Sequence, residues 1–504
     1  MKYINIKIIS ILILLAVTYF SCNKNNLDLK PLQPTESDYF STELEFTKTV
    51  YGIYAKLTDY YWYNGGQDNC ALPVQILPGD DITTPAKEEF EYFTSLNPSS
   101  SRLQYFYKTC YQLIGRSNVL LQKNSAVATG IYTTANLKNY HRGEALFLRS
   151  LGYYHLWNIF GTAPLVTERI QSSDKLSPGN SKKTELLDQA IIDLKEAATL
   201  LPLNWDVNNK GRATSNSANG LLGKCLVFRA NATKSTEDYQ SAITAFNAIS
   251  GVSLVAKFDD NFAADTENNP ESLFEFQATQ ANFDNVWLAN DFDPNNQVGS
   301  MSSFWGLYDT NNFALFGKSP FVATGKLVNI FDTKDPRRDL TLDSASRSIK
   351  KYLARGKSTN SGVASADNPR ILRYADVLLL KAEAILQSGG AASEAIGLIN
   401  QVRSRARAMV GGGTFPADLS TAESNKTTIM QWIMDERLRE LAGEGQRWYD
   451  IKRWHIAGFI TLNNNFFSSA NSALIGFDPN KHINFPIPIN ETDLNTNIVQ
   501  NPGY

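Results

Sequence analysis

Apolar side chains recur three and four positions apart along several parts of the chain, which is the pattern of helices that bury one face. In residues 185–201, for example, Leu187 and Ile191 fall on one such stripe. Ser235, with Asp238 three residues later, is typical of the capped start of another helix. The pattern therefore predicts that helices dominate the fold.

Together the periodic segments predict three hairpins of paired helices. The pairs are 143–160 with 184–201, 217–230 with 236–249, and 374–386 with 392–406. Small residues interrupt the larger ones at Gly152, Gly223, Ala382 and Ala395. Small side chains let two helices approach closely, as in tetratricopeptide-like repeats. We therefore expect repeats of that kind.

The middle of the chain has a different character. Residues 253–370 contain Pro, Gly, Asn and many aromatic residues, and they separate helical repeats near 140–250 from others near 370–455. Within this insertion, residues 271–276 predict a strand or an edge segment. Long connections in compact proteins are usually functional. The expected fold is mainly α, with tetratricopeptide-like helical hairpins packed against an irregular, loop-rich part with a few short strands.

The N-terminus has the features of a secretory signal. Two lysines precede the apolar run 8–17, which is shorter than the roughly 20 residues that a membrane-spanning helix needs. Cys22 follows a small residue directly after this run, as in bacterial lipoprotein signals, although Tyr19 stands where Leu is usual. We expect residues 1–21 to be removed and Cys22 to carry a lipid anchor. The alternative is an ordinary signal peptide with an unrelated cysteine.

Composition narrows the classes of function. Charged residues make up 19% and aromatic residues 11% of the chain, with 48 basic against 50 acidic side chains. This is a globular composition without the basic excess that nucleic-acid binding requires. Apart from Cys22 there are three cysteines, Cys70, Cys110 and Cys225, so at most one disulfide forms. Cys225 lies in an apolar run, where we expect a core thiol.

Five further features follow one another in a fixed order. They are RGEALFLRSLGYY at 142–154 with FGTAPLV at 160–166; GRAT at 211–214; RYADVLLLKAEA at 373–384; Glu436-Arg437, Glu440-Leu441, Glu444-Gly445, Arg447-Trp448 and Arg453-Trp454; and PIP at 486–488 with QNPGY at 500–504. Behind a lipoprotein signal, this combination resembles the SusD/RagB family of glycan-binding lipoproteins over nearly the full mature length.

The resemblance implies a fold, a location and a partner. Members of that family are mostly α-helical, with four tetratricopeptide-like units, and lie on the surface of Bacteroidetes-type bacteria. Each covers the mouth of a SusC-like TonB-dependent transporter, binds oligosaccharides without reacting with them and passes them inward. By this resemblance, residues 22–504 form one glycan-binding domain, anchored to the outer membrane through its lipid.

Two segments suit the chemistry of a saccharide. Sugar rings present C–H faces that stack on aromatic side chains, and hydroxyls that need polar partners. Residues 60–69 and 285–309 combine both kinds of side chain. The predicted stacking residues are Trp62, Trp287, Trp305 and Tyr308, and the predicted hydroxyl partners are Asn64 and Asp68. The resemblance implies an arc of aromatics from the corresponding regions. The alternative is that these rings pack loops, as we expect for Tyr60 and Tyr61.

A surface glycoside hydrolase is one rival reading. Glu440 and Glu444, read as one helical turn apart, would be its acid/base pair. We expect instead that Arg437, Arg439 and Arg447 neutralise these carboxylates, because a paired carboxylate has a lowered pKa and is a poor general acid. A second rival is a helical-repeat scaffold that binds no sugar.

No metal or cofactor is predicted. The four histidines are scattered and do not form the His-Glu-x-x-His spacing of zinc hydrolases. Acidic stretches such as 291–293 could hold calcium, but the spacing fits no standard calcium loop. Asp80 and Asp81, which follow Pro78-Gly79, are interpreted as a structural turn.

Overall fold

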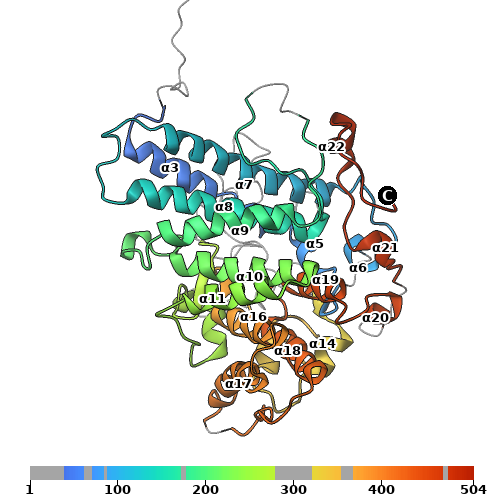
Figure 1. The fold of residues 1–504 in the computed structure, drawn as a ribbon. Helices are drawn as coiled ribbons and strands as arrows, with labels where there is room; N and C mark the ends of the chain where they lie inside the picture. Colours follow the sequence, from blue (N-terminus) through green and yellow to red (C-terminus); the bar gives the residue numbers. More distant parts are fainter. Residues whose placement is uncertain are drawn as a thin grey trace, which may run out of the picture.

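The long helices lie side by side in a layered stack (Figure 1). The computed structural model describes residues 39–61, 71–84, 88–171, 177–278, 321–352, 367–411, 413–468 and 475–504. The helices that make up this helix stack are α3 (Glu43–Tyr54), α7 (Ser101–Ala126), α8 (Leu137–Phe160), α9 (Glu185–Leu200), α10 (Ser215–Thr233), α11 (Thr236–Asn247), α16 (Tyr374–Gln387), α17 (Ala392–Ala408), α18 (Lys426–Leu441) and α19 (Arg447–Ala457). None of the helices in these ranges has the length and apolar character needed to cross a bilayer.

The three predicted hairpins are confirmed as α8 with α9, α10 with α11, and α16 with α17. Local capping explains where several of these helices begin. The hydroxyl of Ser235 accepts a hydrogen bond from the Asp238 backbone at 3.1 Å, and Thr214 does the same for Ser217 at 3.1 Å. Gly389, with a φ of +82°, follows α16 and lets the chain reverse into α17.

Small residues bring neighbouring helices together where the sequence predicted. A Cβ added to Gly152 on α8 would lie 2.9 Å from Ile114 on α7, and one added to Gly223 on α10 would lie 2.3 Å from Phe246 on α11. Ala382 and Ala395 are fully buried. The interpretation of these positions as close helix contacts is therefore confirmed for both glycines.

Two long helices of the stack, α7 and α18, are absent from the predicted hairpins. The signal for α7 is present in the sequence. Leu103, Phe106, Cys110, Leu113 and Ile114 are all buried and follow the spacing of three and four. Its apolar residues are interspersed with polar ones such as Ser117 and Asn118, which are buried too and weaken the pattern.

The described part of the insertion contributes short elements to two small antiparallel sheets. Strand β1 (Ile82–Thr83) pairs with β3 (Val322–Ala323), and β2 (Ser272–Glu275) pairs with β4 (Arg370–Arg373). Strand β2 confirms the strand predicted in residues 271–276. The remaining short elements are α4 (Leu57–Tyr60), α5 (Leu72–Ile76), α6 (Glu89–Tyr92), η3 (Val207–Asn209), η4 (Phe258–Phe262), η5 (Ala264–Thr266), α14 (Gly325–Ile330), α15 (Arg338–Thr341), α20 (Asn464–Ser468), α21 (Pro479–His482) and α22 (Ile489–Leu494).

The cysteines within the described ranges are core thiols. Cys110 and Cys225 are both free and fully buried, which confirms the prediction for Cys225. Burial raises the pKa of the Cys225 thiol to about 12, so it stays protonated and behaves as a small apolar side chain. Cys70 lies outside the described residues.

Candidate functional site

All six predicted ligand residues lie outside the described part of the chain, as does Cys22. These six are Trp62, Asn64, Asp68, Trp287, Trp305 and Tyr308. The structure does place the residues from which their segments start. Tyr61 immediately precedes residues 62–70, and Ala278 immediately precedes residues 279–320.

The described residues that precede these two segments in the sequence lie close together. The ring of Tyr61 stacks on the ring of Phe276, with centroids 5.8 Å apart and planes 18° apart. The Ala278 backbone N–H donates to the Asn368 side chain at 2.7 Å. Tyr61, Phe276 and Ala278, and Asn368, which are far apart in the sequence, are therefore linked by these contacts.

The tyrosines beside these contacts pack as expected. Tyr60 is 1% exposed, donates its hydroxyl to the Cys110 sulfur at 3.2 Å and stacks on His155 at 4.7 Å. Burial raises the pKa of the Tyr61 hydroxyl. Tyr60 and Tyr61 thus fix the start of the first segment rather than offering a free face to a ligand.

A surface groove of about 290 Å³ lies beside the Tyr61–Phe276 contact, and we call it the root groove. Its lining is Tyr51, Tyr54, Ala55, Leu57, Thr58, Asn208, Asn209, Lys210, Gly211, Arg212, Glu275, Phe276 and Gln277. Tyr51 is 48% exposed, and the guanidinium of Arg212 lies 5.5 Å from its ring centre. The volume is close to the lower end of the range for small-molecule sites, roughly 300–1,000 Å³.

Buried polar contacts hold the floor of the root groove. Arg212 donates from Nε and Nη2 to both carboxylate oxygens of Glu144, at 2.7 and 2.6 Å. The Tyr54 hydroxyl donates to the same carboxylate at 2.9 Å and accepts from the Ala213 backbone at 2.8 Å. Helices α3 and α8 and the turn before α10 are thereby joined, which makes the groove rigid.

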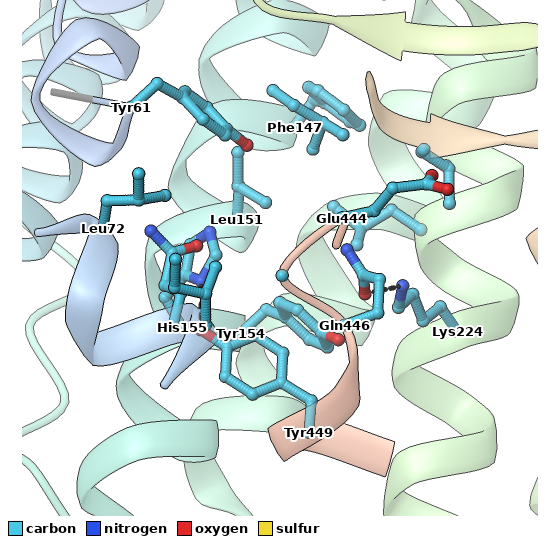
Figure 2. Close-up of a pocket in the computed structure, with 16 residues that line it drawn as sticks. Tyr61, Leu72, Phe147, Leu151, Tyr154, His155, Lys224, Glu444, Gln446 and Tyr449 are labelled. Carbon is cyan, nitrogen blue, oxygen red and sulfur yellow. Dashed lines mark hydrogen bonds between the residues drawn. The ribbon is translucent and has the colours of Figure 1, made fainter. Parts of the chain in front are cut away.

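An enclosed cavity lies deeper, below Tyr61 (Figure 2). Its volume is about 30 Å³, enough for one or two water molecules and far too small for a sugar ring. Lys224 on its wall donates to Gln446 at 2.6 Å and to Asp376 at 2.7 Å. Burial lowers the pKa of His155 to about 3, so the imidazole facing this cavity is neutral. The cavity is a feature of the core.

The geometry of Glu440 and Glu444 differs from the predicted one. Helix α18 ends at Leu441, and Glu444 lies in the turn that follows, between glycines of positive φ. The carboxylate of Glu440 accepts hydrogen bonds from Arg337 at 2.9 Å and Arg373 at 2.7 Å, and also pairs with Arg405. Glu444 accepts from Lys351 at 2.7 Å and from Arg373 at 2.8 Å.

The predicted neutralisation is confirmed, but the predicted partners are wrong. Burial alone would raise the pKa of Glu440, yet Arg405, Arg373 and Arg337 outweigh it and hold that pKa well below its ordinary value. The pKa of Glu444 is lowered as well, with burial opposed by Arg373 and Lys351. Carboxylates in this state do not donate protons at neutral pH, so this pair is unsuited to general acid catalysis.

The arginines named from the sequence are engaged elsewhere. Arg437 pairs with Asp376 and Asp450 at 2.8 Å, Arg447 pairs with Asp80, and Arg439 donates to the Ile330 carbonyl at 3.0 Å. The true partners of Glu440 come from segments far away in sequence. Spacing along one helix therefore predicted correctly that the two carboxylates are neutralised, but it named the wrong arginines as their partners.

Asp80 and Asp81 form a buried turn, in agreement with their structural interpretation. Asp80 pairs with Arg447 and Lys326, and these cations lower its pKa against the opposing effect of burial. Burial and the neighbouring Asp80 raise the pKa of Asp81 to about 6. Thr324 joins this turn to β3 by donating its hydroxyl to the Asp80 carbonyl at 2.7 Å.

Among the described residues, no group of three or more His, Cys, Asp or Glu side chains is arranged to hold a metal ion. The acidic stretch 291–293 lies outside these ranges.

Comparison with known proteins gives relatives over the whole chain. The SusD family profile matches residues 227–504, and a profile described as starch-binding associating with outer membrane matches residues 27–227. SusD-like protein P2 of Formosa agariphila is 26% identical in an alignment 522 positions long that covers 98% of each chain. Starch-binding protein SusD of Bacteroides thetaiotaomicron is 24% identical in an alignment 564 positions long that covers 95% of each chain.

Solved structures share the fold. A SusD homolog from Bacteroides thetaiotaomicron superposes with a TM-score of 0.75 at 22% identity, covering 94% of this chain and 99% of that one. A laminarin-binding SusD-like protein gives a TM-score of 0.72 at 24% identity, covering 92% and 100%. With a family profile matched over more than half of its length and this helical fold, the chain belongs to the SusD family.

Proposed function

We propose that this protein is a cell-surface lipoprotein that binds an oligosaccharide without reacting with it and delivers it to a SusC-like TonB-dependent transporter in the outer membrane. The observation that carries the proposal is the Tyr61–Phe276 stack beside the root groove, because Tyr61 belongs to the first aromatic-rich segment and Phe276 precedes the second by nine residues in the sequence. The names of similar proteins point to the same class of ligand, since one relative is a starch-binding protein and one structural neighbour is a laminarin-binding protein.

The proposed contacts are those expected from the sequence. Trp62, Trp287, Trp305 and Tyr308 stack on sugar rings, while Asn64 and Asp68 bond to hydroxyls. The support from the structure is the groove lined by Tyr51, Phe276 and Gln277, which combines an exposed ring with amides, and Phe276 stacks on Tyr61. Ring stacking is worth on the order of 1 kcal/mol or more for each aromatic.

Affinity electrophoresis tests the site. The protein is run in native gels that contain laminarin or starch, and slowed migration reports binding. We expect Trp62→Ala and Trp305→Ala to remove most of the retardation. Trp432→Ala is the matched control, because this tryptophan is on α18, away from the root groove. Unchanged retardation in both site variants would refute the proposed residues.

The proposal also states that the glycan is not cleaved. The Glu440–Glu444 pair is locked in ion pairs, which removes the acid/base candidate named from the sequence. Laminarin and starch incubated with the purified protein should be recovered at their original length, as measured by chromatography. Shortened products would favour the hydrolase instead.

The anchor and the partner are tested separately. Residues 1–21 are proposed to be a signal peptide and residues 22–504 the mature glycan-binding domain, lipidated at Cys22. The Cys22→Ser protein should then move from the membrane fraction to the soluble fraction. The wild-type protein should co-purify with a large β-barrel transporter from detergent-solubilised outer membranes. A protein that binds glycan but never retains such a barrel would contradict the delivery step.

A further inference from the structure

We propose that a second saccharide-binding groove lies beside Trp205, in the turn between α9 and α10, apart from the predicted aromatic segments. The inference rests on the proposed function for its class of ligand. It concerns described residues, and its stacking group is the half-buried indole ring of Trp205, which lines the groove. We call this site the Trp205 groove.

Three contacts fix the indole of Trp205. Its Nε1–H donates to the Ala213 carbonyl at 2.8 Å, and the Arg212 guanidinium lies 4.0 Å from the ring centre. Tyr140 meets the ring edge-on, with centroids 5.3 Å apart. Arg212 is itself held by the fully buried Glu144. A ligand that stacks here would not have to order the ring first, which is the main cost that preorganisation removes.

The Trp205 groove has room for a saccharide. Its volume is about 500 Å³, within the range of small-molecule sites. Besides Trp205 and Arg212 its lining includes Leu203, Val207, Asn204, Asn216, Asn268 and Ser272. Leu203 is 46% exposed and Val207 is 84% exposed. Exposed apolar groups among amides and hydroxyls suit a ligand that has both C–H faces and hydroxyls.

The charges favour a neutral ligand. The charged residues that line the Trp205 groove are Asp206, Lys210 and Arg212, and the last of these is neutralised by Glu144. One acid and one base remain, so the groove has no net field that would select an anion.

The Trp205 groove adjoins the root groove. Both are lined by Lys210, Gly211 and Arg212. Gly211 has a φ of +95°, and a Cβ there would lie 2.3 Å from the Gln277 side chain. The positive φ favours glycine at this position, where the turn lies against the Gln277 side chain. The second groove thus lies next to the first but has its own aromatic ring, Trp205, and its own polar lining.

Fluorine NMR of protein labelled with 5-fluorotryptophan tests the proposal. The chain has eight tryptophans, and the Trp205 resonance is assigned by its loss in Trp205→Phe. On titration with laminarin- and starch-derived oligosaccharides, we expect a saturable shift of the Trp205 resonance. The shift should persist in the Trp62→Ala/Trp305→Ala protein. About 0.5 M NaCl should leave half-saturation unchanged, because stacking is not screened.

Each other outcome is decisive. If the resonances of Trp62, Trp287 or Trp305 move while Trp205 stays fixed, the Trp205 groove is refuted and the proposed function survives. The same follows if the Trp205 shift vanishes in the double variant. If no resonance moves with any of these glycans, the proposed function fails and the second groove with it.

A side-chain deletion adds a control for folding. Asn204 is exposed, so Asn204→Ala should leave the fold intact and raise the concentration for half-saturation of the Trp205 shift about fivefold, as expected for one lost hydrogen bond. Asn247→Ala, at an exposed position on α11 outside the groove, should have no effect. If Asn204→Ala and Asn247→Ala gave the same concentration for half-saturation, the assignment of a saccharide site to the Trp205 groove would be contradicted.

Discussion

At the scale of single residues, the most unusual feature is a cluster of buried ion pairs. Arg337 is fully buried and donates to Asp335, Glu436 and Glu440. Arg373 is 1% exposed and extends the same cluster. Charges in the interior are tolerated only when each one is fully paired, because the lost hydration is large. The cluster joins the described part of the insertion to α18.

The first prediction concerns the centre of this cluster. Glu440→Gln removes the charge that three guanidiniums share and leaves them under-compensated in the core. We expect the free energy of unfolding to fall by about 3–5 kcal/mol, measured by urea denaturation. Asp339→Asn is the control, because its carboxylate is 75% exposed and pairs with Arg338 at the surface. That change should lower the free energy of unfolding by less than about 1 kcal/mol. If both variants lost the same free energy of unfolding, burial would not be what makes the Glu440 charge important.

The second prediction concerns the buried carboxyl of Asp81, whose pKa is raised to about 6. The unfolded chain releases this proton near pH 4, whereas the folded protein keeps it until about pH 6. Stability contributed by the protonated group is therefore lost as pH rises through that window.

In Asp81→Asn this loss is absent. Relative to wild type, the variant should gain about 2–3 kcal/mol in free energy of unfolding between pH 4 and pH 7. Urea denaturation at several pH values measures the difference. A difference that stays flat over this range would show that Asp81 is ionised throughout.

At the scale of elements, hydrophobic spacing predicted the three hairpins but not α3, α7, α18 or α19 of the helix stack. Stripes such as Leu187 and Ile191 are apolar without interruption, and their helix was found. In α7 and α18 the buried faces include Asn118, Glu436 and Glu440, which a periodicity argument counts as exposed. The partners that make those polar residues suitable for the core come from distant segments, so local sequence does not contain the information.

The third prediction tests the close contact between α10 and α11. Gly223→Ala places a methyl group where the ring of Phe246 lies, and Phe246 is itself 4% exposed. We expect the free energy of unfolding to fall by about 1–3 kcal/mol, despite the better helix propensity of alanine. Thermal or urea denaturation measures this loss.

Gly397 on α17 offers a matched control. It is also helical, but nothing lies within 4 Å of an added Cβ. Gly397→Ala should therefore stabilise the protein by about 0.5–1 kcal/mol. If both substitutions stabilise it to the same extent, the helices are not packed as closely as described.

At the scale of the whole molecule, the sequence predicted the fold class and family better than the site. The order of motifs such as residues 211–214 identified the family, yet Arg212 and Glu144 in those motifs turn out to join helices. The convergence of Tyr61 and Phe276 depends on how the chain returns through β2 to α3 and α4, which no local pattern reveals. The sequence analysis did not single out Trp205, because the far side of its groove, Asn268 to Phe274, comes from a segment more than 60 residues away.

Isothermal titration calorimetry with laminarin- and starch-derived oligosaccharides tests the central claim most directly. The account predicts saturable binding to the intact protein, little changed by salt and strongly weakened in Trp62→Ala/Trp305→Ala, with the oligosaccharide recovered unshortened. Absence of any heat of binding across these glycans, or undiminished binding in the double variant, would contradict it.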